Sequence, residues 1–408
     1  MRWFIFIIIY ILVDIYAFQA IKTITKSPWL HGLYVFISLA VLAGLIYELS
    51  FLGSGKMMQP PKMYFFGIFL AVFVPKLVLI VFMFGEDIAR FFVGIFMKVA
   101  GSNEAQFMAS RRKFVSMIAL GIAAIPFASL LYGMIQGKYN YKVLRYALEF
   151  DDLPDAFDGF KLTQISDIHS GSIDSPRKVE YAVNLVNEQQ SDVILFTGDL
   201  VNNIAEEMND WKALFSTLRA PEGVFSVLGN HDYGDYVAWE SKEAQAKNLQ
   251  KLKNLQREMG WNLLLNKNSF IEKNGERIAL VGVENWGENG FKKAGDLDKA
   301  CEGISEKDFK ILMSHDPSHW QSVVKHDPRN FQLTLSGHTH GMQFGIEIPG
   351  LLKWSPIKYR YKNWAGIYEE FGRYINVNRG FGFLGYPGRV GIWPEITVIQ
   401  LKKRQNTV

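Results

Sequence analysis

The sequence has only one cysteine, Cys301, among its 408 residues. A single thiol cannot form a disulfide within the chain, so disulfide bonds do not hold this fold together. Small disulfide-rich secreted scaffolds are therefore excluded. A lone cysteine is compatible with a domain that is exported from a bacterial type of cell.

Long runs of like charge and two common catalytic motifs are also missing. The net charge is +4 with no long basic run, so electrostatics favour neither DNA nor RNA as a partner. The chain shows no internal repeat and no serine-centred nucleophile elbow. Residues 380–388 are rich in glycine, but they lack the lysine and the helix of a P-loop, so turns are expected there.

Apolar residues, in contrast, are abundant and unevenly distributed. Four mostly apolar stretches occupy residues 3–20, 31–51, 64–84 and 114–133. Each is close to the ~20 residues that a helix needs to span a bilayer. A core helix of a soluble protein can imitate one such stretch, but four in succession before a polar region predict a multi-pass membrane protein.

Two charged residues interrupt these stretches, Asp14 in the first and Lys76 in the third. A charge at the centre of a spanning helix costs about 2.5–3.5 kcal/mol on insertion scales. The two helices cross in the same direction, so the charges either meet at one depth and neutralise each other, or each faces protein or interface separately. Residues 89–100 mix Phe and Ile with Arg90 and Lys98, which predicts an interfacial amphipathic helix.

The cluster Arg111-Arg112-Lys113 adjoins the fourth stretch. By the positive-inside rule this end lies in the cytoplasm, so the rest of the chain is expected on the extracytoplasmic face of the cell membrane. Residues 110–115 also resemble a twin-arginine export signal, and an ordinary basic flank is the alternative. Because no small-x-small cleavage site follows, the helix is expected to stay as an anchor.

The composition divides the chain into three parts. Residues 1–136 are expected to form the transmembrane region, 137–158 a polar linker, and 159–402 a folded polar domain. The domain includes two recognisable helices. One is predicted over 176–189, with proline at its first position, and a charged, solvent-covered helix is predicted over 238–259.

Polar residues follow five short apolar runs of this domain. The runs are residues 160–165, 193–196, 224–228, 309–313 and 331–335. Each of them ends close to Asp, Asn or His. Because the carboxyl ends of parallel strands meet at one crevice in α/β sheets, these side chains are expected to converge.

The converging set has two carboxylates, one amide and four imidazoles, namely Asp167, Asp199, Asn230, His169, His315, His338 and His340. Nitrogen and oxygen ligands of this kind suit two borderline divalent metals, and Asp199 is the natural bridge between them. A single Asp-x-His or Gly-Asp motif is more often a turn or a helix cap. The joint pattern is what favours a metal centre.

These motifs carry a resemblance to a known family. Asp-x-His, Gly-Asp, Gly-Asn-His-Asp, a later His, and Gly-His-x-His resemble the five blocks of the calcineurin-like metallophosphoesterase superfamily, over about residues 145–402. Ser166 is a departure, since the family often has glycine before the first Asp. The expected fold is thus the four-helix transmembrane region predicted from the apolar stretches, followed by an α/β metallophosphoesterase domain, which the resemblance implies is a two-sheet β-sandwich flanked by helices.

The same resemblance implies which residues bind metal. The first metal would be held by Asp167, His169, Asp199 and His340. The second would be held by Asp199, Asn230, His315 and His338. His231 stands where the family has an acid histidine that is not a ligand. Two divalent ions are expected, Mn²⁺ first, with Fe or Zn as alternatives.

The expected activity is hydrolysis of a phosphate ester or pyrophosphate by metal-activated hydroxide in a membrane-anchored enzyme. His231 would protonate the leaving oxygen, and Asp232 either orients His231 or caps the turn. The expected substrate is a phosphorylated small molecule, a lipid headgroup or an envelope polymer. The alternative class is a non-catalytic membrane sensor or scaffold with a vestigial metal site, which the complete set of ligands disfavours.

Residues 351–363 form a further segment rich in aromatic and basic side chains. A long loop within a compact domain is usually functional. A rim of the metal site is expected from Trp354, Tyr359, Arg360, Tyr361, Lys362 and Trp364. For the tryptophans, a local mini-core is the alternative.

Overall fold

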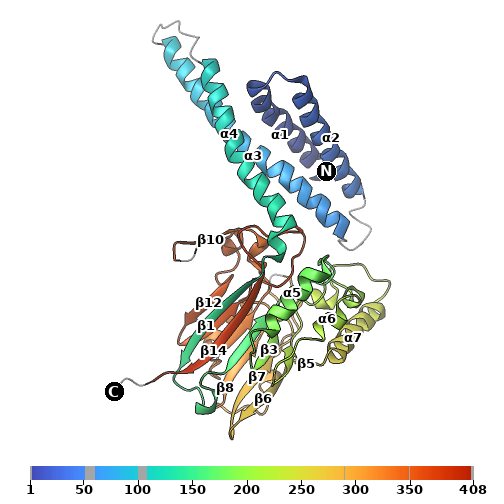
Figure 1. The fold of residues 1–408 in the computed structure, drawn as a ribbon, viewed down its shortest axis with the longest axis vertical. Helices are drawn as coiled ribbons and strands as arrows, with labels where there is room; N and C mark the ends of the chain where they lie inside the picture. The colour runs from blue at the N-terminus through green and yellow to red at the C-terminus, as the bar shows by residue number, and fades with distance from the viewer. Residues whose placement is uncertain (1, 51–59, 100–107, 289, 349, 406–408) are drawn as a thin grey trace. The chain divides into compact units, whose positions relative to one another are not determined.

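The structure, a computed structural model, describes residues 2–50, 60–99, 108–288, 290–348 and 350–405. The chain divides into two compact units, a helical unit up to Ile135 and an α/β unit from Gln136 onward. Figure 1 shows the long helices of the first and the mixed sheets of the second. Each unit has a hydrophobic core of its own.

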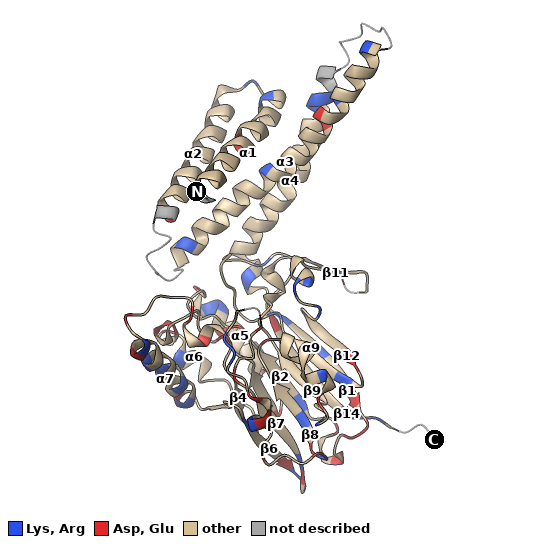
Figure 2. Ribbon diagram, turned by 180° about the vertical axis from the view of Figure 1, so that it is seen from behind, with Lys and Arg blue, Asp and Glu red and all other residues tan. Residues whose placement is uncertain are grey.

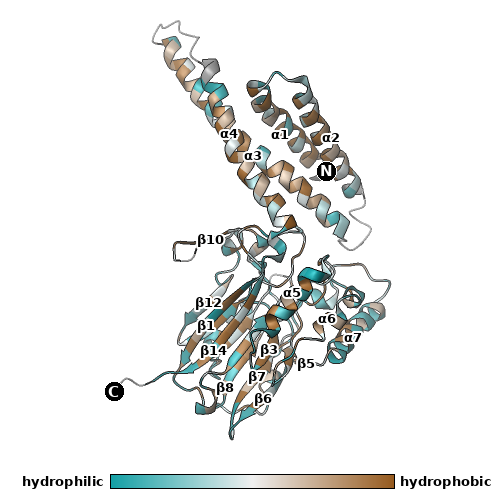
Figure 3. Cartoon of the chain, viewed as in Figure 1, coloured by the Kyte–Doolittle hydropathy of each residue, from teal (hydrophilic) through white to brown (hydrophobic). Residues whose placement is uncertain are grey.

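The helical unit contains α1 (Arg2–Ile24), α2 (Pro28–Ser50), α3 (Pro60–Val99) and α4 (Met108–Ile135). All four are long and apolar enough to cross a membrane, and Figure 3 shows them as mostly hydrophobic. The prediction of four apolar helices ahead of an α/β domain is confirmed. Residue 51, the end of the second predicted stretch, lies outside the described residues.

α3 is much longer than the stretch predicted from hydropathy. Its 40 residues correspond to about 60 Å at 1.5 Å per residue. The segment predicted as a separate amphipathic helix is therefore the end of α3, as far as Val99, and residue 100 lies outside the described part of the chain. The acidic residues Glu86 and Asp87 do not interrupt the helix, because Arg112 of α4 forms ion pairs with both.

Asp14 and Lys76 meet inside the helical unit. Lys76 is buried, and its ammonium group donates hydrogen bonds to the Asp14 carboxylate and, at 2.8 Å, to Oγ of Ser38. The Tyr34 hydroxyl donates to Oδ1 of Asp14 at 3.1 Å. Charges are sparse in these helices (Figure 2). The interpretation in which these two charges neutralise each other is confirmed, and pairing lowers the cost of placing them between apolar helices.

The α/β unit contains two six-stranded sheets and a two-stranded one. The first sheet has the order β1 (Lys142–Phe150), β14 (Glu395–Lys403), β2 (Lys161–Ile165), β3 (Val193–Phe196), β4 (Val224–Ser226), β5 (Trp261–Leu263). The second has the order β12 (Gly366–Glu370), β13 (Arg373–Val377), β9 (Leu333–Ser336), β8 (Phe309–Met313), β7 (Glu276–Gly282), β6 (Lys267–Lys273). The small sheet pairs β10 (Ile346–Ile348) with β11 (Leu352–Trp354).

The two large sheets pack face to face. Leu162 and Leu195 of the first sheet and Leu280 and Ile311 of the second belong to one buried cluster. Burial of each such side chain contributes about 1.5–3 kcal/mol. Helices flank the sheets: α5 (Pro176–Asn187), α6 (Lys212–Phe215) and α7 (Lys242–Glu258), labelled in Figure 1, α9 (Ser318–Ser322), labelled in Figure 2, and the short α8 (Leu297–Ala300). The predicted β-sandwich flanked by helices is confirmed.

The segment predicted as a linker, residues 137–158, is part of the folded domain, and this prediction was wrong. Its middle part is β1, which pairs in parallel with β14 from Lys142 opposite Glu395 to Phe150 opposite Lys403. Its alternating exposed and inward residues looked like a polar linker, but Leu148 and Phe150 enter the sandwich core. The domain therefore begins before Phe160.

Two predicted helices are present with different ends. α5 begins at Pro176 as expected and ends at Asn187, two residues before the predicted end. α7 begins at Lys242, four residues after the predicted start, because the Ser241 side chain accepts a hydrogen bond from the backbone N–H of Ala244 and caps the helix there.

Candidate metal centre

Five parallel strands bring the predicted ligands together. Asp167 and His169 follow β2, Asp199 follows β3, and Asn230 follows β4, all in the first sheet. Two strands of the second sheet supply the rest, with His315 after β8 and His338 and His340 after β9. The shared edge is therefore built from both sheets of the sandwich.

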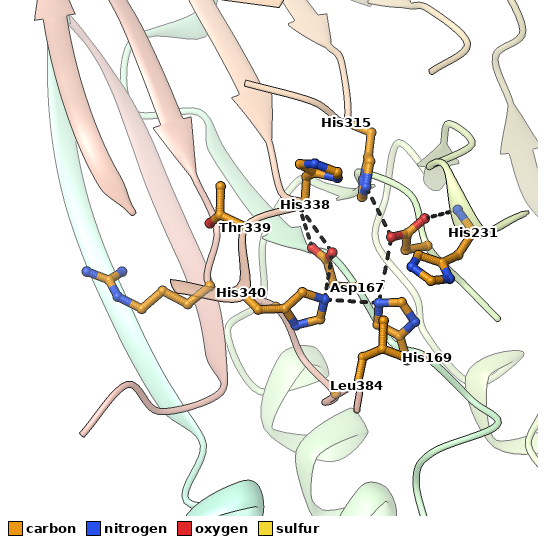
Figure 4. Close-up of polar contacts among 12 residues, drawn as sticks. Asp167, His169, His231, His315, His338, Thr339, His340 and Leu384 are labelled. Carbon is orange, nitrogen blue, oxygen red and sulfur yellow. Dashed lines mark hydrogen bonds and ion pairs between the residues drawn. The ribbon is translucent and has the colours of Figure 1, made fainter. Parts of the chain in front are cut away.

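The side chains point at a common centre (Figure 4). Nε2 of His169 lies 3.0 Å from Nε2 of His340, which lies 3.2 Å from Oδ1 of Asp167. Oδ2 of Asp199 lies 3.6 Å from Nε2 of His169 and 3.2 Å from Nε2 of His315. Asp199 thus lies between the two groups of ligands.

Two sets of three donors are close enough to share an ion. They are Asp167 with His169 and His340, and Asp167 with Asp199 and His315, and in each set the ligand atoms lie within 4.8 Å of one another. Asn230 and His338 complete the site, with Oδ1 of Asn230 2.8 Å from Nδ1 of His338. The structure brings all seven predicted ligands together at this edge of the sandwich.

The donor set fits divalent cations. Asp167, Asp199 and His315 are almost entirely buried, and Nε2 of His315 is a buried nitrogen without a hydrogen bond. Buried carboxylates and imidazoles that face each other across about 3 Å, away from water, form a ready set of ligands for divalent cations. The residues present therefore match the requirements of a two-metal centre.

In two of these histidines, His169 and His315, the other ring nitrogen is fixed by the protein. Nδ1 of His169 lies 3.1 Å from Oδ1 of Asn202, and Nδ1 of His315 lies 2.7 Å from the carbonyl oxygen of Thr197. A ring nitrogen that donates to such an oxygen carries the proton, which leaves Nε2 free as a ligand. The fold thus selects the tautomer that a metal ligand requires.

His231 is oriented in the same way. Its Nδ1 lies 2.8 Å from the carbonyl oxygen of Asn202, so that Nε2 is free, and its ring centre lies 4.9 Å from that of His169. Its backbone N–H donates to Oδ1 of Asp199 at 2.8 Å. His231 therefore borders the centre, with its position and tautomer fixed.

Asp232 does not orient His231. Its buried carboxylate accepts hydrogen bonds from the backbone N–H groups of Asp199, Leu200, Val201 and Gly229, at 2.8 to 3.3 Å. Of the two roles considered for Asp232, the turn cap is the one present in the structure. The carboxylate ties the loop after β3 to the loop after β4, and so fixes the positions of Asp199 and Asn230.

The backbone of the site is held in a costly conformation. The φ angles of Asp167, His169, Asp199, His338 and His340 lie between 49° and 73°. Non-glycine residues in this left-handed region cost about 1–3 kcal/mol each and persist where the surrounding structure enforces them, often at functional sites.

Two motif glycines are required because the loops approach each other closely. A Cβ atom on Gly229 would lie 2.2 Å from Oδ1 of Asp199, and one on Gly337 would lie 2.3 Å from Oδ2 of Asp167. Either side chain would displace a predicted ligand. This explains the glycine in both Gly-Asn-His-Asp and Gly-His-Thr-His.

The pKa values of the ligand histidines are shifted in opposite directions. Burial lowers the pKa of His338 to about 4 and that of His169 well below its usual value, so both are neutral at pH 7. Burial also acts to lower the pKa of His315, but the negative charge of Asp199 outweighs it and raises that pKa to about 10. Before metal binds, His315 is therefore the protonated partner of Asp199.

Two tyrosines hold ligands on the Asn230 side of the centre. The amide Nδ2 of Asn230 donates to the Tyr236 hydroxyl at 2.7 Å, and Nε2 of His338 lies 2.8 Å from the Tyr361 hydroxyl. The ring of Tyr236 also lies 4.4 Å from that of His231, centre to centre. Tyr361 is therefore at the rim of the centre, as predicted.

The rest of the predicted rim has mixed outcomes. Trp364 packs with Tyr361, Ala365 and Ile392 in a small buried cluster, which is the mini-core alternative. Lys362 pairs with Glu370, and the Tyr359 ring is exposed. The residues expected to form one rim therefore have different roles: Trp364 belongs to a mini-core, and Tyr361 also contacts the metal site.

Several residues near the centre were not predicted. Asn202, Tyr236 and Phe291 contact predicted site residues from loops without a motif of their own. Arg389 is fully buried, donates to the carbonyl oxygen of Gly382 at 2.6 Å, and lies 3.4 Å from Nδ1 of His340. The glycine-rich segment was the one available signal, because a Cβ atom on Gly382 would lie 1.9 Å from the carbonyl oxygen of Ile168.

Known protein families match both units. The family described as calcineurin-like phosphoesterase matches residues 160–342, and the family described as probable calcineurin-like phosphoesterase, transmembrane domain, matches residues 1–138. The chain therefore belongs to the calcineurin-like metallophosphoesterases, in a group that carries an N-terminal transmembrane domain. The predicted family is confirmed. Members of the family bind two divalent metals and act on phosphoesters, and the chain is a membrane protein.

Similar proteins occur in bacteria and animals. The chain is 28% identical to the uncharacterized metallophosphoesterase YkuE of Bacillus subtilis over 303 residues, which covers 72% of this chain and 98% of YkuE. It is 27% identical to a transmembrane protein with metallophosphoesterase domain of Danio rerio, with 71% of this chain and 63% of that protein covered. Among solved structures, phosphopantetheinyl hydrolase of Mycobacterium tuberculosis matches 54% of this chain and 89% of its own, at 14% identity and a TM-score of 0.34.

Proposed function

We propose that this protein is a membrane-anchored phosphoesterase that hydrolyses a phosphate ester or a pyrophosphate with two divalent cations, of which Mn²⁺ is the first candidate. The best support for the proposal is the position of Asp199. Its buried carboxylate contacts the rings of His169 and His315 and lies between the two groups of donors. The same carboxylate oxygen, Oδ2, faces both histidines, so Asp199 could contribute to both sets of ligands.

Each residue has a distinct part in the proposed reaction. One ion would be held by Asp167, His169, Asp199 and His340, and the other by Asp199, Asn230, His315 and His338. When bound, two such cations activate water at neutral pH and neutralise phosphoryl oxygens. The protein supplies the fixed ring tautomers, the strained loops and the exclusion of water that hold these ligands in place.

His231 is the proposed proton donor to the leaving oxygen. Its Nδ1 is held by the Asn202 carbonyl, so Nε2 is the atom that carries and releases the proton. Burial lowers the pKa of His231, and Asp199 acts against this effect. A lowered pKa makes the imidazolium a stronger acid, at the cost of a smaller protonated fraction at neutral pH.

The substrate is proposed to be a phosphorylated small molecule, a lipid headgroup or an envelope polymer, on the extracytoplasmic face of the cell membrane. The anchor supports this choice, because four apolar helices keep the domain at a membrane where such molecules are concentrated. No nucleic acid is proposed as a partner, since the net charge of +4 is spread without a long basic run.

The test is an activity screen of the full-length protein in detergent with Mn²⁺, over p-nitrophenyl phosphate, bis(p-nitrophenyl) phosphate and diphosphate esters. Asp199→Asn should abolish hydrolysis and lower the metal content while the domain still folds. Asp155→Asn is the matched control, because Asp155 is an exposed carboxylate that pairs only with Lys403 in the described structure. Full turnover by Asp199→Asn would refute the proposal, and bound metal without hydrolysis of any substrate would favour a sensor or scaffold.

A further inference from the structure

Arg360 is a cation held in place by aromatic rings. It follows the short 3₁₀ helix Pro356–Tyr359 and is exposed to solvent. The guanidinium carbon of Arg360 lies 5.2 Å from the centre of the Phe291 ring and 5.4 Å from the centre of the Tyr361 ring. Stacking of this kind contributes about 0.5–1 kcal/mol at exposed sites and restricts where the charge can move.

The same two rings contact a predicted metal ligand. The Phe291 ring meets the His338 ring edge-on, with centres 4.8 Å apart and an angle of 88° between the planes. The Tyr361 hydroxyl lies 2.8 Å from Nε2 of His338. Arg360 is therefore separated from the metal centre by one layer of aromatic rings, on the side of His338.

The charge of Arg360 also acts on the hydroxyl of Tyr236. Burial raises the pKa of the Tyr236 hydroxyl to about 12, and the positive charge of Arg360 acts against the increase. Tyr236 is bonded to Asn230, the second ligand on this side. The guanidinium therefore influences the groups that hold both His338 and Asn230.

No carboxylate neutralises Arg360 within the described part of the chain. Neighbouring charges differ in this respect. Lys362 lies 2.7 Å from a carboxylate oxygen of Glu370, and Arg379 pairs with Glu347 and Glu395. Glu288, whose negative charge also reaches Tyr361, accepts a hydrogen bond from Ser322 at 2.5 Å. A guanidinium that is positioned but not paired is suited to bind a phosphate through two parallel hydrogen bonds.

We propose that the substrate carries a second phosphate next to the scissile one, that Arg360 binds this second phosphate, and that the substrate class is therefore a diphosphate ester. The inference rests on the proposed function. Two metal cations at the centre suffice to balance the charge of one phosphoryl group. Arg360 is a further fixed cation, separated from the centre by one layer of aromatic rings, and it would balance the charge of a second phosphate. In the reaction, the water oxygen bonds to the attacked phosphorus as the bond from that phosphorus to the bridging oxygen breaks, and the bridging oxygen takes a proton from His231 and departs with the second phosphate. The proton lost by the water goes to solvent, and Arg360 faces the charge on the departing phosphate.

The kinetic test uses two substrates that differ by one phosphate, bis(p-nitrophenyl) phosphate and P1,P2-bis(p-nitrophenyl) diphosphate. The wild-type protein with Mn²⁺ should have the higher kcat/KM for the diphosphate. Arg360→Gln should reduce kcat/KM for the diphosphate about 10- to 100-fold, mainly through KM, which is the effect of losing a charge-assisted hydrogen bond. The loss for the single phosphate should be at least about tenfold smaller.

Two further variants separate a specific role from general charge or folding effects. Arg360→Lys keeps the charge without the planar fork and should recover part of the loss. Lys358→Gln removes another exposed cation of the same segment, which lies over the Tyr359 ring, and should leave both substrates unaffected. Equal losses on both substrates for Arg360→Gln, or a wild-type preference for the single phosphate, would overturn the inference.

A binding measurement distinguishes this inference from the proposed function. Calorimetry on the Mn²⁺-loaded protein should show that Arg360→Gln weakens methylenediphosphonate binding at least about tenfold and affects inorganic phosphate much less. That difference without turnover of any substrate would support Arg360 as a diphosphate site and refute the hydrolase. Unchanged methylenediphosphonate binding would refute the role of Arg360, whatever the activity.

Discussion

Nε2 of His169 and Nε2 of His340 face each other across 3.0 Å, although the two residues come from strands of different sheets. Two unprotonated ring nitrogens at this separation repel each other unless a proton or a cation lies between them. The side chains on both sides of this pair are acceptors, because Asp167 lies 3.2 Å from His340 and Asp199 lies 3.6 Å from His169. Substitution of one histidine of this pair therefore tests whether a metal ion binds between them.

We expect His340→Ala to remove one ion and spare the other. The metal content of the purified protein, measured by inductively coupled plasma mass spectrometry, should fall from about two ions to about one per chain, because the second set of ligands is untouched. His326→Ala is the matched control, since His326 packs against Phe371 away from the centre. Loss of both ions would show that the two sites are not independent, and loss of neither would remove His340 from the ligand set.

We expect His231→Ala to leave metal binding intact and to slow only reactions that need a proton donor. Loss of a general acid typically costs about 10²–10⁴-fold. Alkyl phosphate esters, with poor leaving groups, should show that loss, whereas p-nitrophenyl esters should lose far less because their leaving group departs without a proton. Steady-state kinetics on the two ester types provide the measurement. Equal losses on both would contradict the acid role.

The strand ends could be predicted because they follow a simple physical rule. Each short apolar run stops where the chain leaves the sandwich, and the next polar residues face the shared edge, as at Asp167 and His338. β1 could not be predicted in this way, because its partner β14 follows almost 250 residues later and its exposed face resembles a linker. The full length of α3 was hidden as well, since Glu86 and Asp87 look like the end of a helix until Arg112 is placed beside them.

The surroundings of the site were harder to predict than the ligands. Asn202 holds His169 through its side-chain oxygen and His231 through its backbone carbonyl, but one loop residue has no sequence pattern that reveals two such partners. Phe291 and Arg389 reach the centre from segments far along the chain, and only the folded structure brings them there. Asp232 illustrates the opposite case, in which a conspicuous motif residue supports the backbone instead of the chemistry.

Tyr361→Phe should weaken metal binding without unfolding the domain. The hydroxyl is the only described hydrogen-bond partner of Nε2 of His338, so its removal leaves the ring oriented by Asn230 and the ring contacts alone. Loss of such a supporting group typically costs about 10- to 100-fold in metal affinity. Competition with a fluorescent chelator gives the affinity, and a thermal melt of the metal-free protein gives the stability. Tyr359→Phe, at an exposed ring of the same segment, should change neither quantity.

Metal binding should release a proton from His315. In the metal-free protein Asp199 keeps the pKa of His315 at about 10, so the ring is charged at pH 7 and must become neutral to act as a ligand. Metal affinity should therefore rise with pH until the pH reaches about 10. Calorimetry in buffers of different ionisation enthalpy measures the released proton, and the release should be smaller in His315→Ala. Affinity that is independent of pH between 6 and 9 would contradict this account.

The same shift predicts how the stability of the metal-free protein depends on pH. The pKa of His315 is higher in the folded state, about 10, than the ~6.5 of an unfolded histidine. The charged ring and Asp199 therefore stabilise the fold fully below about pH 6.5, and this contribution is lost as the pH rises through about 10. Thermal melts of the chelator-treated protein across this range should show a falling midpoint, and the slope should disappear in His315→Ala.

The α/β domain is expected on the extracytoplasmic side, because the positive-inside rule would place the cluster Arg111, Arg112 and Lys113, near the start of α4, in the cytoplasm. Arg112 forms ion pairs with Glu86 and Asp87. Acidic residues contribute little to the positive-inside rule, so these ion pairs do not change the orientation that the basic cluster predicts. Alkaline phosphatase, which needs an oxidising compartment, should be active when fused after Gly137 and after Val408. A fusion between α1 and α2, at residues 25–27, is the control and should be inactive, since that loop would face the cytoplasm.

Substitution of Arg111 and Arg112 by lysine tests the route by which the domain reaches that side. The change keeps both positive charges, so the topology signal is preserved, but a twin-arginine signal would be lost and the folded domain would stay in the cytoplasm. Protease protection in spheroplasts, read with an antibody against the domain, distinguishes the outcomes. Export that is unaffected by the substitution would reject the twin-arginine route and leave the topology standing. A cytoplasmic domain in the unaltered protein would overturn both and direct the search for a substrate to the inner leaflet.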